Sequence, residues 1–267
     1  MDNIWILFLL FTIYSLIGWT TETILCSIEA GKFINRGFLN GPFCPIYGVG
    51  GVIVAYLLFP LKDNLFILYI ASVLITTTIE YLTGVALEVL FHTKYWDYSH
   101  LKFNFQGRIC LQNSLGFGIM CVVGMLYVHP FLLNLLLSIP ASILPFISGG
   151  FMFYFLCDTI ITVHAILQLN GKLAELQQVI DEIKAKASAA TTVKLESLQA
   201  SLGNLLDEET KANLASLFEK KDKIEKANKP LQRRIIKAFP TMTSIRNNES
   251  LQRIKDMILN KTKNNNK

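Results

Sequence analysis

Residues 65–91 read LFILYIASVLITTTIEYLTGVALEVLF. This run has only two charged residues, Glu80 and Glu88, in 27 positions. As an α-helix it would extend about 40 Å at roughly 1.5 Å per residue, which exceeds the ~30 Å hydrocarbon core of a bilayer. Because a small soluble core has no room for so long an apolar helix, the stretch predicts a membrane-spanning helix.

Four further runs have the same character. Together they predict five membrane-spanning helices, at residues 4–26, 45–61, 65–91, 111–133 and 143–167, of which the second is the shortest and the most interrupted by glycine. The chain of 267 residues is 52% hydrophobic and 17% charged, whereas roughly a quarter of the residues in a soluble domain are charged. We therefore expect an all-α fold, a polytopic membrane helix bundle.

The charged residues are concentrated after the last of these runs. Residues 172–267 hold 19 of the 25 Lys and Arg and 12 of the 20 Asp and Glu, so their net charge is +7 against −2 for residues 1–171. This segregation excludes a secreted disulfide scaffold, a free-standing soluble enzyme and a fibrous repeat. It predicts a transmembrane domain over 1–171, a helical or coiled-coil segment over 172–228 and a basic amphipathic tail over 229–267.

The distribution of positive charge also predicts the orientation in the membrane. The loops at 27–44 and 92–110 contain Lys and Arg residues, as does the tail, whereas the opposite side contains only Lys62. Positively charged loops are retained in the cytoplasm. With an odd number of spans, the N-terminus of this multi-pass protein is expected outside the cell and the C-terminus in the cytoplasm.

Two stretches about 70 residues apart resemble each other. Gly18 and Glu22 have the same spacing as Gly84 and Glu88, and in the following loops Lys32-Phe33 precedes Gly37 by the interval at which Lys102-Phe103 precedes Gly107. This echo predicts two helix pairs in a parallel internal repeat. A chance match between apolar segments is the alternative.

Four acidic residues fall within the predicted spans, namely Glu22, Glu80, Glu88 and Asp158. A carboxylate in lipid is costly, so an intramembrane acid normally faces the protein interior and has a partner. The natural counter-charges are Arg36 and Arg108, each beside a glycine in a cytoplasmic loop. Two interpretations follow: Glu–Arg pairs that fix helix order, or a polar cavity for a substrate, an ion or a lipid headgroup.

The two cytoplasmic loops have unusual compositions. The first is rich in Gly and Pro, which predicts either a re-entrant segment or an ordered surface loop; its motif residues are Gly37, Gly41, Pro42, Pro45, Tyr47 and Gly48. The second combines aromatic residues with Asp97, Arg108 and Asn113, and Trp96 fits an interfacial belt. The chain has no catalytic or nucleotide-binding fingerprint and no metal-ligand spacing of Cys and His, so no cofactor or metal is expected.

After residue 170 the pattern becomes that of a charged helix. Apolar residues alternate at intervals of three and four up to Leu205, with an interruption at 188–192. This heptad seam predicts a folded-back hairpin or one long helix, through which the chain could self-associate. Residues 229–267 carry a net charge of +8, and basic amphipathic helices suit anionic membrane lipids. Nucleic acid would be attracted by the same charge, but a tether beneath a membrane disfavours it.

Several separated motifs carry a family resemblance. The strings GWTTE, RGFLNGPFCPIYG, EYLTGVALE and WDYSHLKFNFQGRICLQNSLGFG resemble the bacterial family of ABC-transporter permeases of the CmpB type, over roughly residues 10–165. The resemblance implies a permease component in a bacterial plasma membrane, with an ATPase or another membrane protein as its partner. Neither cytoplasmic loop carries the EAA-type signature with which conventional ABC permeases engage their ATPase.

The leading hypothesis is therefore a permease-like membrane protein with a cytoplasm-facing polar cavity. The residues expected to line it are Glu22, Arg36, Glu80, Glu88, Asp97, Arg108, Asn113 and Asp158. The first alternative is a lipid-modifying enzyme that uses Asp97, His100 or a glutamate as acid or base, with no catalytic residue assigned. The second is a membrane scaffold that acts through its cytoplasmic helical tail.

Overall fold

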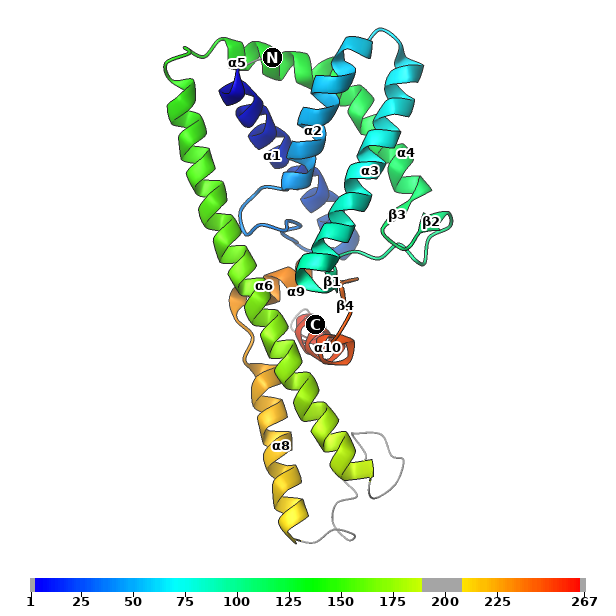
Figure 1. Cartoon of the computed structure of the whole chain (residues 1–267), viewed down its shortest axis with the longest axis vertical. Helices are drawn as coiled ribbons and strands as arrows, with labels where there is room; N and C mark the ends of the chain where they lie inside the picture. Colours follow the sequence, from blue (N-terminus) through cyan, green and yellow to red (C-terminus); the bar gives the residue numbers. More distant parts are fainter. Residues whose placement is uncertain (1–2, 189–207, 265–267) are drawn as a thin grey trace. The chain divides into compact units, whose positions relative to one another are not determined.

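The computed structural model describes residues 3–188 and 208–264 (Figure 1). Helices dominate it, and the four strands have two residues each. The elements are α1 (Ile4–Ala30), α2 (Pro45–Leu58), the 3₁₀ turn η1 (Phe59–Leu61), α3 (Leu65–Phe91), β1 (Thr93–Lys94), β2 (Asn104–Phe105), β3 (Ile109–Cys110), α4 (Leu111–Val123), the π-helical turn η2 (Gly124–Val128), α5 (His129–Leu137), α6 (Leu144–Ser188), α8 (Glu208–Lys226), α9 (Pro230–Ala238), β4 (Thr243–Ser244) and α10 (Asn248–Asn264).

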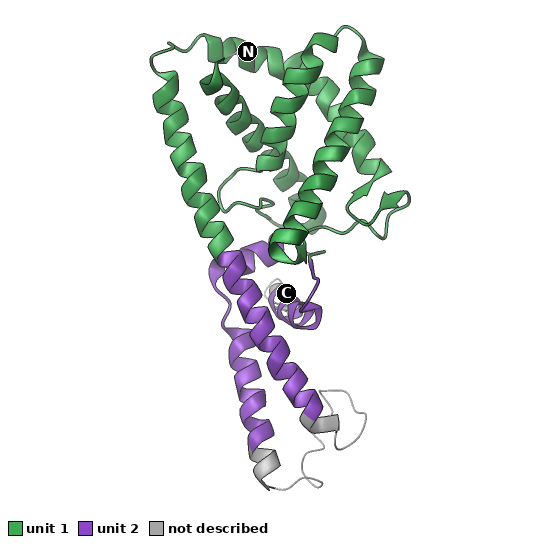
Figure 2. Ribbon diagram, viewed as in Figure 1, with its two compact units in different colours: residues 1–164, 238–242 green, residues 165–237, 243–267 purple. Residues whose placement is uncertain are grey.

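The chain forms two compact units (Figure 2). The first, which we call the membrane unit, comprises residues 1–164 together with the short segment Ala238–Met242. The second, the tail unit, comprises residues 165–237 and 243–267. The long helix α6 begins in the first unit and ends in the second.

Four helical stretches are long and apolar enough to cross a membrane, namely Ile4–Ala30, Leu65–Phe91, Leu111–Leu137 and Leu144–Ala185. In α3 only 17% of the most apolar 18-residue window is buried within the protein. Large apolar side chains such as Phe66 (74% exposed) and Phe146 (82% exposed) need an apolar solvent instead. The chain is thus an all-α, multi-pass membrane protein.

The predicted second span is the exception in length. Residues Pro45–Leu61 form an apolar helix of α2 and η1 that is shorter than the other spans, which have 27 residues or more. At roughly 1.5 Å per residue it extends about 25 Å, somewhat less than the hydrocarbon core. Length and composition therefore establish four spans, while a fifth at this position is left to the proposal below.

Local sequence sets the ends of the spans. The Asn3 side chain accepts a hydrogen bond from Trp5 N (3.0 Å) at the start of α1, and Gly31 ends that helix with a φ of 63°. Asn64 caps α3 in the same way, accepting from Ile67 N at 3.1 Å. Pro130, near the start of α5, has no N–H for the preceding turn, and the π-helical turn η2 lies immediately before that helix.

Residues 31–44, here called the folded-back loop, return alongside α1. They are held by a polar stripe of α1 whose members lie one helical turn apart: Ser15, Trp19, Thr23 and Ser27. The bonds join Ile34 N to Ser27 Oγ (2.9 Å), Arg36 N to Thr23 Oγ1 (3.3 Å), Trp19 Nε1 to Asn35 Oδ1 (2.7 Å) and Cys44 N to the Ser15 carbonyl (2.9 Å). The loop thus runs alongside α1 as far as the middle of that helix.

The second loop contains a tight hairpin. Strands β2 and β3 pair antiparallel, with Phe105 opposite Ile109. Gln106 and Gly107 turn the chain between them with φ values of 54° and 69°. An added Cβ at Gly107 would overlap the Asp97 side chain, so only glycine fits there.

In the tail unit the described part of the predicted heptad seam is buried, because Leu173, Leu176, Ile180 and Ile183 are at most 1% exposed. An ion pair of Lys220 with Glu175 (3.5 Å) links α8 to α6, so the described helices fold back on each other. The turn predicted at 188–192 falls almost entirely in residues 189–207, outside the described residues. The apolar faces of α9 and α10 are also buried within this unit, through Ile235, Ile236, Leu251 and Ile254.

Glycines allow α2 to pack closely on α1, and this contact can be tested. A Cβ at Gly18 would overlap the Tyr47 ring, whereas a Cβ at Gly116 in α4 meets no atom within 4 Å. We expect Gly18→Ala to lower the free energy of unfolding by about 1–3 kcal/mol through overpacking. The matched Gly116→Ala should be neutral or slightly stabilising. Thermal unfolding in nanodiscs measures both, and equal effects of the two variants would refute the packing argument.

Candidate functional site

Polar side chains from several elements of the membrane unit meet in one place, which we call the central polar cluster. Its members are Glu22 of α1, Arg36 of the folded-back loop, Tyr47 of α2, Glu80 of α3, Tyr98 of the second loop and Asn113 of α4. Residues up to 91 positions apart in the sequence are therefore brought together. Most of them were predicted from the sequence as cavity-lining residues.

Glu22 has two partners. Its Oε2 lies 3.5 Å from Arg36 Nε, and its Oε1 accepts a hydrogen bond of 2.5 Å from the Tyr47 hydroxyl. Arg36 reaches this position because its backbone N–H is bonded to Thr23, one residue after Glu22. Tyr47 does so because its ring packs directly over Gly18. The folded-back loop and the α1–α2 contact thus build this part of the cluster.

Glu80 is the deeply buried acid of the cluster, at 6% exposure. The Tyr98 hydroxyl forms a side-chain hydrogen bond with it, and the charge of Glu22 also acts on it. Among the described residues, its Oε2 is buried without a hydrogen-bond partner. Burial raises the pKa of Tyr98, and the charges of Glu80 and Glu22 raise it further, so the phenol stays a donor. The cluster thus holds two acidic side chains, Glu22 and Glu80, and one guanidinium, that of Arg36, which pairs with Glu22.

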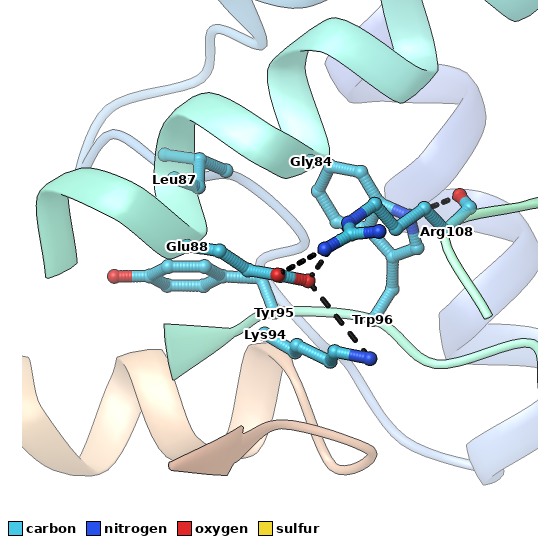
Figure 3. Close-up of a pocket in the computed structure, with 7 residues that line it drawn as sticks. All are labelled: Gly84, Leu87, Glu88, Lys94, Tyr95, Trp96 and Arg108. Atoms are coloured by element: carbon cyan, nitrogen blue, oxygen red, sulfur yellow. Dashed lines mark hydrogen bonds and ion pairs between the residues drawn. The ribbon is translucent and has the colours of Figure 1, made fainter. Parts of the chain in front are cut away.

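Glu88 and Arg108 form a separate site, shown in Figure 3. The Arg108 guanidinium donates two hydrogen bonds to the Glu88 carboxylate, from Nε to Oε1 at 3.1 Å and from Nη2 to Oε2 at 2.5 Å. Lys94 Nζ lies 4.0 Å from the same carboxylate, and Trp96 Nε1 donates to the Arg108 carbonyl at 2.8 Å. The pKa of Arg108 is raised by its hydrogen bond with Glu88.

The pocket around this ion pair is small. Its lining residues are Gly84, Leu87, Glu88, Lys94, Tyr95, Trp96 and Arg108 (Figure 3). Because the Glu88 carboxylate already accepts two hydrogen bonds from Arg108, it has little capacity left to bind a ligand. The pair joins the β2–β3 hairpin to α3.

Asp158 of α6 serves the folded-back loop. Its carboxylate accepts from two successive backbone N–H groups, Asn40 N at 3.0 Å and Gly41 N at 2.8 Å. Thr162 one turn later donates to it at 3.3 Å. A Cβ at Gly41 would overlap the Tyr154 hydroxyl, so a larger residue there would displace that side chain. The buried Asp158 carboxylate thus satisfies two backbone amides of the folded-back loop.

Asp97 shapes the second loop. Its Oδ1 accepts from the backbone N–H (3.0 Å) and the hydroxyl (2.5 Å) of Ser99. The pKa of Asp97 is lowered chiefly by the Ser99 side-chain hydrogen bond, although partial burial opposes this. Because Asp97 is engaged in this turn and His100 is exposed, the structure does not join them into an acid–base pair.

The structure also reveals a buried pair that sequence reasoning missed. The Tyr14 hydroxyl lies 2.7 Å from His129 Nδ1, and His129 is fully buried at the start of α5. A lone polar residue in an apolar run, directly before Pro130, was the only signal for it. Sequence reasoning also left Tyr98 out of the predicted cavity lining. In the described part of the chain, no group of three or more His, Cys, Asp or Glu residues could hold a metal ion.

The Glu88–Arg108 pair can be tested by breaking and then removing it. Arg108→Met leaves a largely buried carboxylate without its main partner, so we expect a loss of about 3 kcal/mol in the free energy of unfolding. The double variant Glu88→Met, Arg108→Met removes both charges and should recover most of the loss. Chemical unfolding in detergent measures both variants, and a double variant as unstable as the single one would contradict the pairing.

Comparison with known proteins gives one match. A family model described as "Putative ABC-transporter type IV" matches residues 9–163, which is more than half of the chain and nearly all of the membrane unit. No curated protein and no solved structure matches. The matched range contains every member of the central polar cluster and both Glu–Arg pairs. On this evidence the chain belongs to that ABC-transporter family.

Proposed function

We propose that this protein is the membrane-embedded component of a transport system, and that the central polar cluster binds the transported ligand. The observation that carries the proposal is the buried Glu80 oxygen that has no partner among the described residues. An unsatisfied carboxylate oxygen away from water is costly. Such a cost is typical of functional sites, where a ligand supplies the missing partner.

The charge of the cluster indicates the class of ligand. The cluster contains two acidic side chains, Glu22 and Glu80, but its one guanidinium pairs with Glu22. The hydroxyls of Tyr47 and Tyr98 already donate to the two acids. What the cluster lacks is a further donor or positive charge. The ligand is therefore the cationic or donor-rich part of a solute or of a lipid headgroup, such as an ammonium group.

The contrast with the second ion pair supports this assignment. The Glu88 carboxylate has a bidentate arginine and a nearby lysine, whereas the central polar cluster leaves an oxygen open. A merely structural pair is expected to be complete. The lipid-modifying alternative gains no support, since Asp97 is engaged with Ser99 in its turn.

The proposal places the cluster near the cytoplasmic side of a bacterial plasma membrane. Counting Pro45–Leu61 as a short fifth span puts the N-terminus outside and the tail inside, in agreement with the excess of Lys and Arg in the loops and the tail. The family suggests membrane and ATPase partners in general. The tail unit is the part of the chain that we propose to bind such a partner or a second copy.

A parallel internal repeat forms part of this proposal. Glu22 and Glu88 are 66 residues apart, and each has an arginine partner from the loop that follows its helix. The helices α2 and α4 each begin after a buried cysteine N-cap, Cys44 and Cys110, again 66 residues apart. The repeat would then have diverged in chemistry, with one pair complete and the other left open for a ligand.

Ligand-dependent thermal unfolding in nanodiscs tests the proposed function. Spermidine, choline and ethanolamine serve as cationic probes, and phosphate and citrate as anionic ones. At a concentration 100 times its Kd, a ligand stabilises the folded state by about 2.7 kcal/mol. We expect at least one cation to raise the unfolding temperature of the wild type, and neither anion to do so.

Two matched variants locate the effect. Glu80→Gln removes the charge from the cluster and should abolish the response to the cation. Glu29→Gln makes the same change at an exposed position near the end of α1 and should preserve it. The absence of any cation response in the wild type, or an unchanged response in Glu80→Gln, would contradict the proposal.

A further inference from the structure

Five residues from the far end of the sequence belong to the membrane unit. The segment Ala238–Met242 is assigned to it, although the residues on either side belong to the tail unit. The side chains of Ala238, Phe239 and Met242 are buried, at 1%, 7% and 2% exposure, while Pro240 and Thr241 are exposed. This is the pattern of a peptide docked by its two ends.

The segment is a preformed turn. Met242 N donates to the Phe239 carbonyl at 3.0 Å, which closes a four-residue turn with Pro240 at its second position. Proline is favoured there because its φ is already that of the turn. The turn directs Phe239 into the membrane unit at little cost in conformational entropy.

Phe239 enters a site formed by aromatic residues and one arginine. The Tyr95 ring meets it edge-on with centroids 5.2 Å apart, and Tyr95 in turn contacts Phe38 (5.6 Å) and Phe91 (6.4 Å). The Arg36 guanidinium lies over the Phe239 ring, 4.7 Å from its centroid. Arg36 Nη1 also donates a hydrogen bond to the Ala238 carbonyl. The segment thus offers the arginine both a π face and a carbonyl acceptor.

The same guanidinium serves the central polar cluster. Its Nε faces Glu22 while its Nη1 faces the segment. The position of Arg36 therefore depends on two partners, one in the predicted ligand site and one contributed by residues about 200 positions later. Loss of the second partner would leave the arginine free to take other rotamers.

From these contacts we propose that the Ala238–Met242 segment is an intramolecular ligand of the membrane unit and that Phe239 is a positioning residue for Arg36. When the segment is docked, Arg36 is held beside Glu22. When the segment leaves, the folded-back loop around Arg36 loosens and the cluster loses its only arginine. The inference rests on the proposed function for its consequence, since it makes the tail a control on the ligand site.

Hydrogen–deuterium exchange on the full chain in nanodiscs tests the docking itself. We expect Phe239→Ala to speed amide exchange about fivefold in residues 33–44, the factor that loss of one ordinary cation–π contact produces. Exchange in the β2–β3 hairpin, which has its own anchor in Glu88 and Arg108, should be unchanged. Phe103→Ala, at a phenylalanine that is 80% exposed, is the control.

Two conservative variants separate positioning from simple anchoring. Phe239→Tyr keeps a π face and should exchange like the wild type. Phe239→Leu keeps apolar bulk without a π face and should loosen residues 33–44 as Phe239→Ala does. If Phe239→Ala raises exchange throughout the protein, this pair decides the question alone.

The outcomes divide cleanly. Unchanged exchange of residues 33–44 in Phe239→Ala, or wild-type behaviour of Phe239→Leu, would overturn the proposal. The result does not depend on any ligand, so it stands or falls separately from the proposed function. If the docking is found and the cationic probes still fail to bind, the ligand site is refuted and the segment remains a structural clamp.

Discussion

The membrane unit depends on the satisfaction of the backbone N–H groups of its folded-back loop. In an apolar bundle no water replaces a lost hydrogen bond, so irregular backbone is tolerated only where protein supplies the partners. In the folded-back loop, the backbone N–H groups of Ile34, Arg36 and Cys44 bond to Ser27, Thr23 and Ser15 of α1. Those of Asn40 and Gly41 bond to the Asp158 carboxylate. Without these bonds Arg36 would not lie beside Glu22, and the central polar cluster would not exist.

The acidic residues of the apolar helices are paired in three different ways. Asp158 is satisfied by backbone amides, and Glu88 by the two arms of Arg108. Glu22 pairs with Arg36 and accepts from the Tyr47 hydroxyl, whereas Glu80 has the Tyr98 hydroxyl as its partner and one oxygen left open. The first two arrangements are complete and hold loops in place. The third is incomplete, and for that reason we propose it as the ligand site.

The helices and the acids could be predicted from the sequence because both follow simple rules. Length and hydropathy identify the spans, and an acidic residue within an apolar run can be recognised directly in the sequence. The partner of each acid was less accessible, because it depends on the path of the loops. Asp158 was expected to line a cavity with Glu22, yet it binds Asn40 and Gly41, whose approach to α6 no local pattern indicates.

Other features left a weak signal or none. The polar stripe of α1 was visible as four residues at intervals of four, but apolar neighbours on the other faces obscured it. The contact of Phe239 with Arg36 joins residues 203 positions apart, and the periodicity of a sequence cannot predict a contact over that separation. The apolar faces of α9 and α10 suited a membrane surface as a pattern, whereas in the structure they are buried in the tail unit.

The central claim is that the central polar cluster is kept for a ligand and not for stability. The free energy of unfolding of two matched variants, measured without ligand, tests it most directly. Glu88→Gln breaks a complete ion pair and is predicted to cost about 2–3 kcal/mol, whereas Glu80→Gln removes an incompletely satisfied charge and should leave stability unchanged or raise it. A loss in Glu80→Gln as large as that in Glu88→Gln would show that the cluster is structural and would contradict the account.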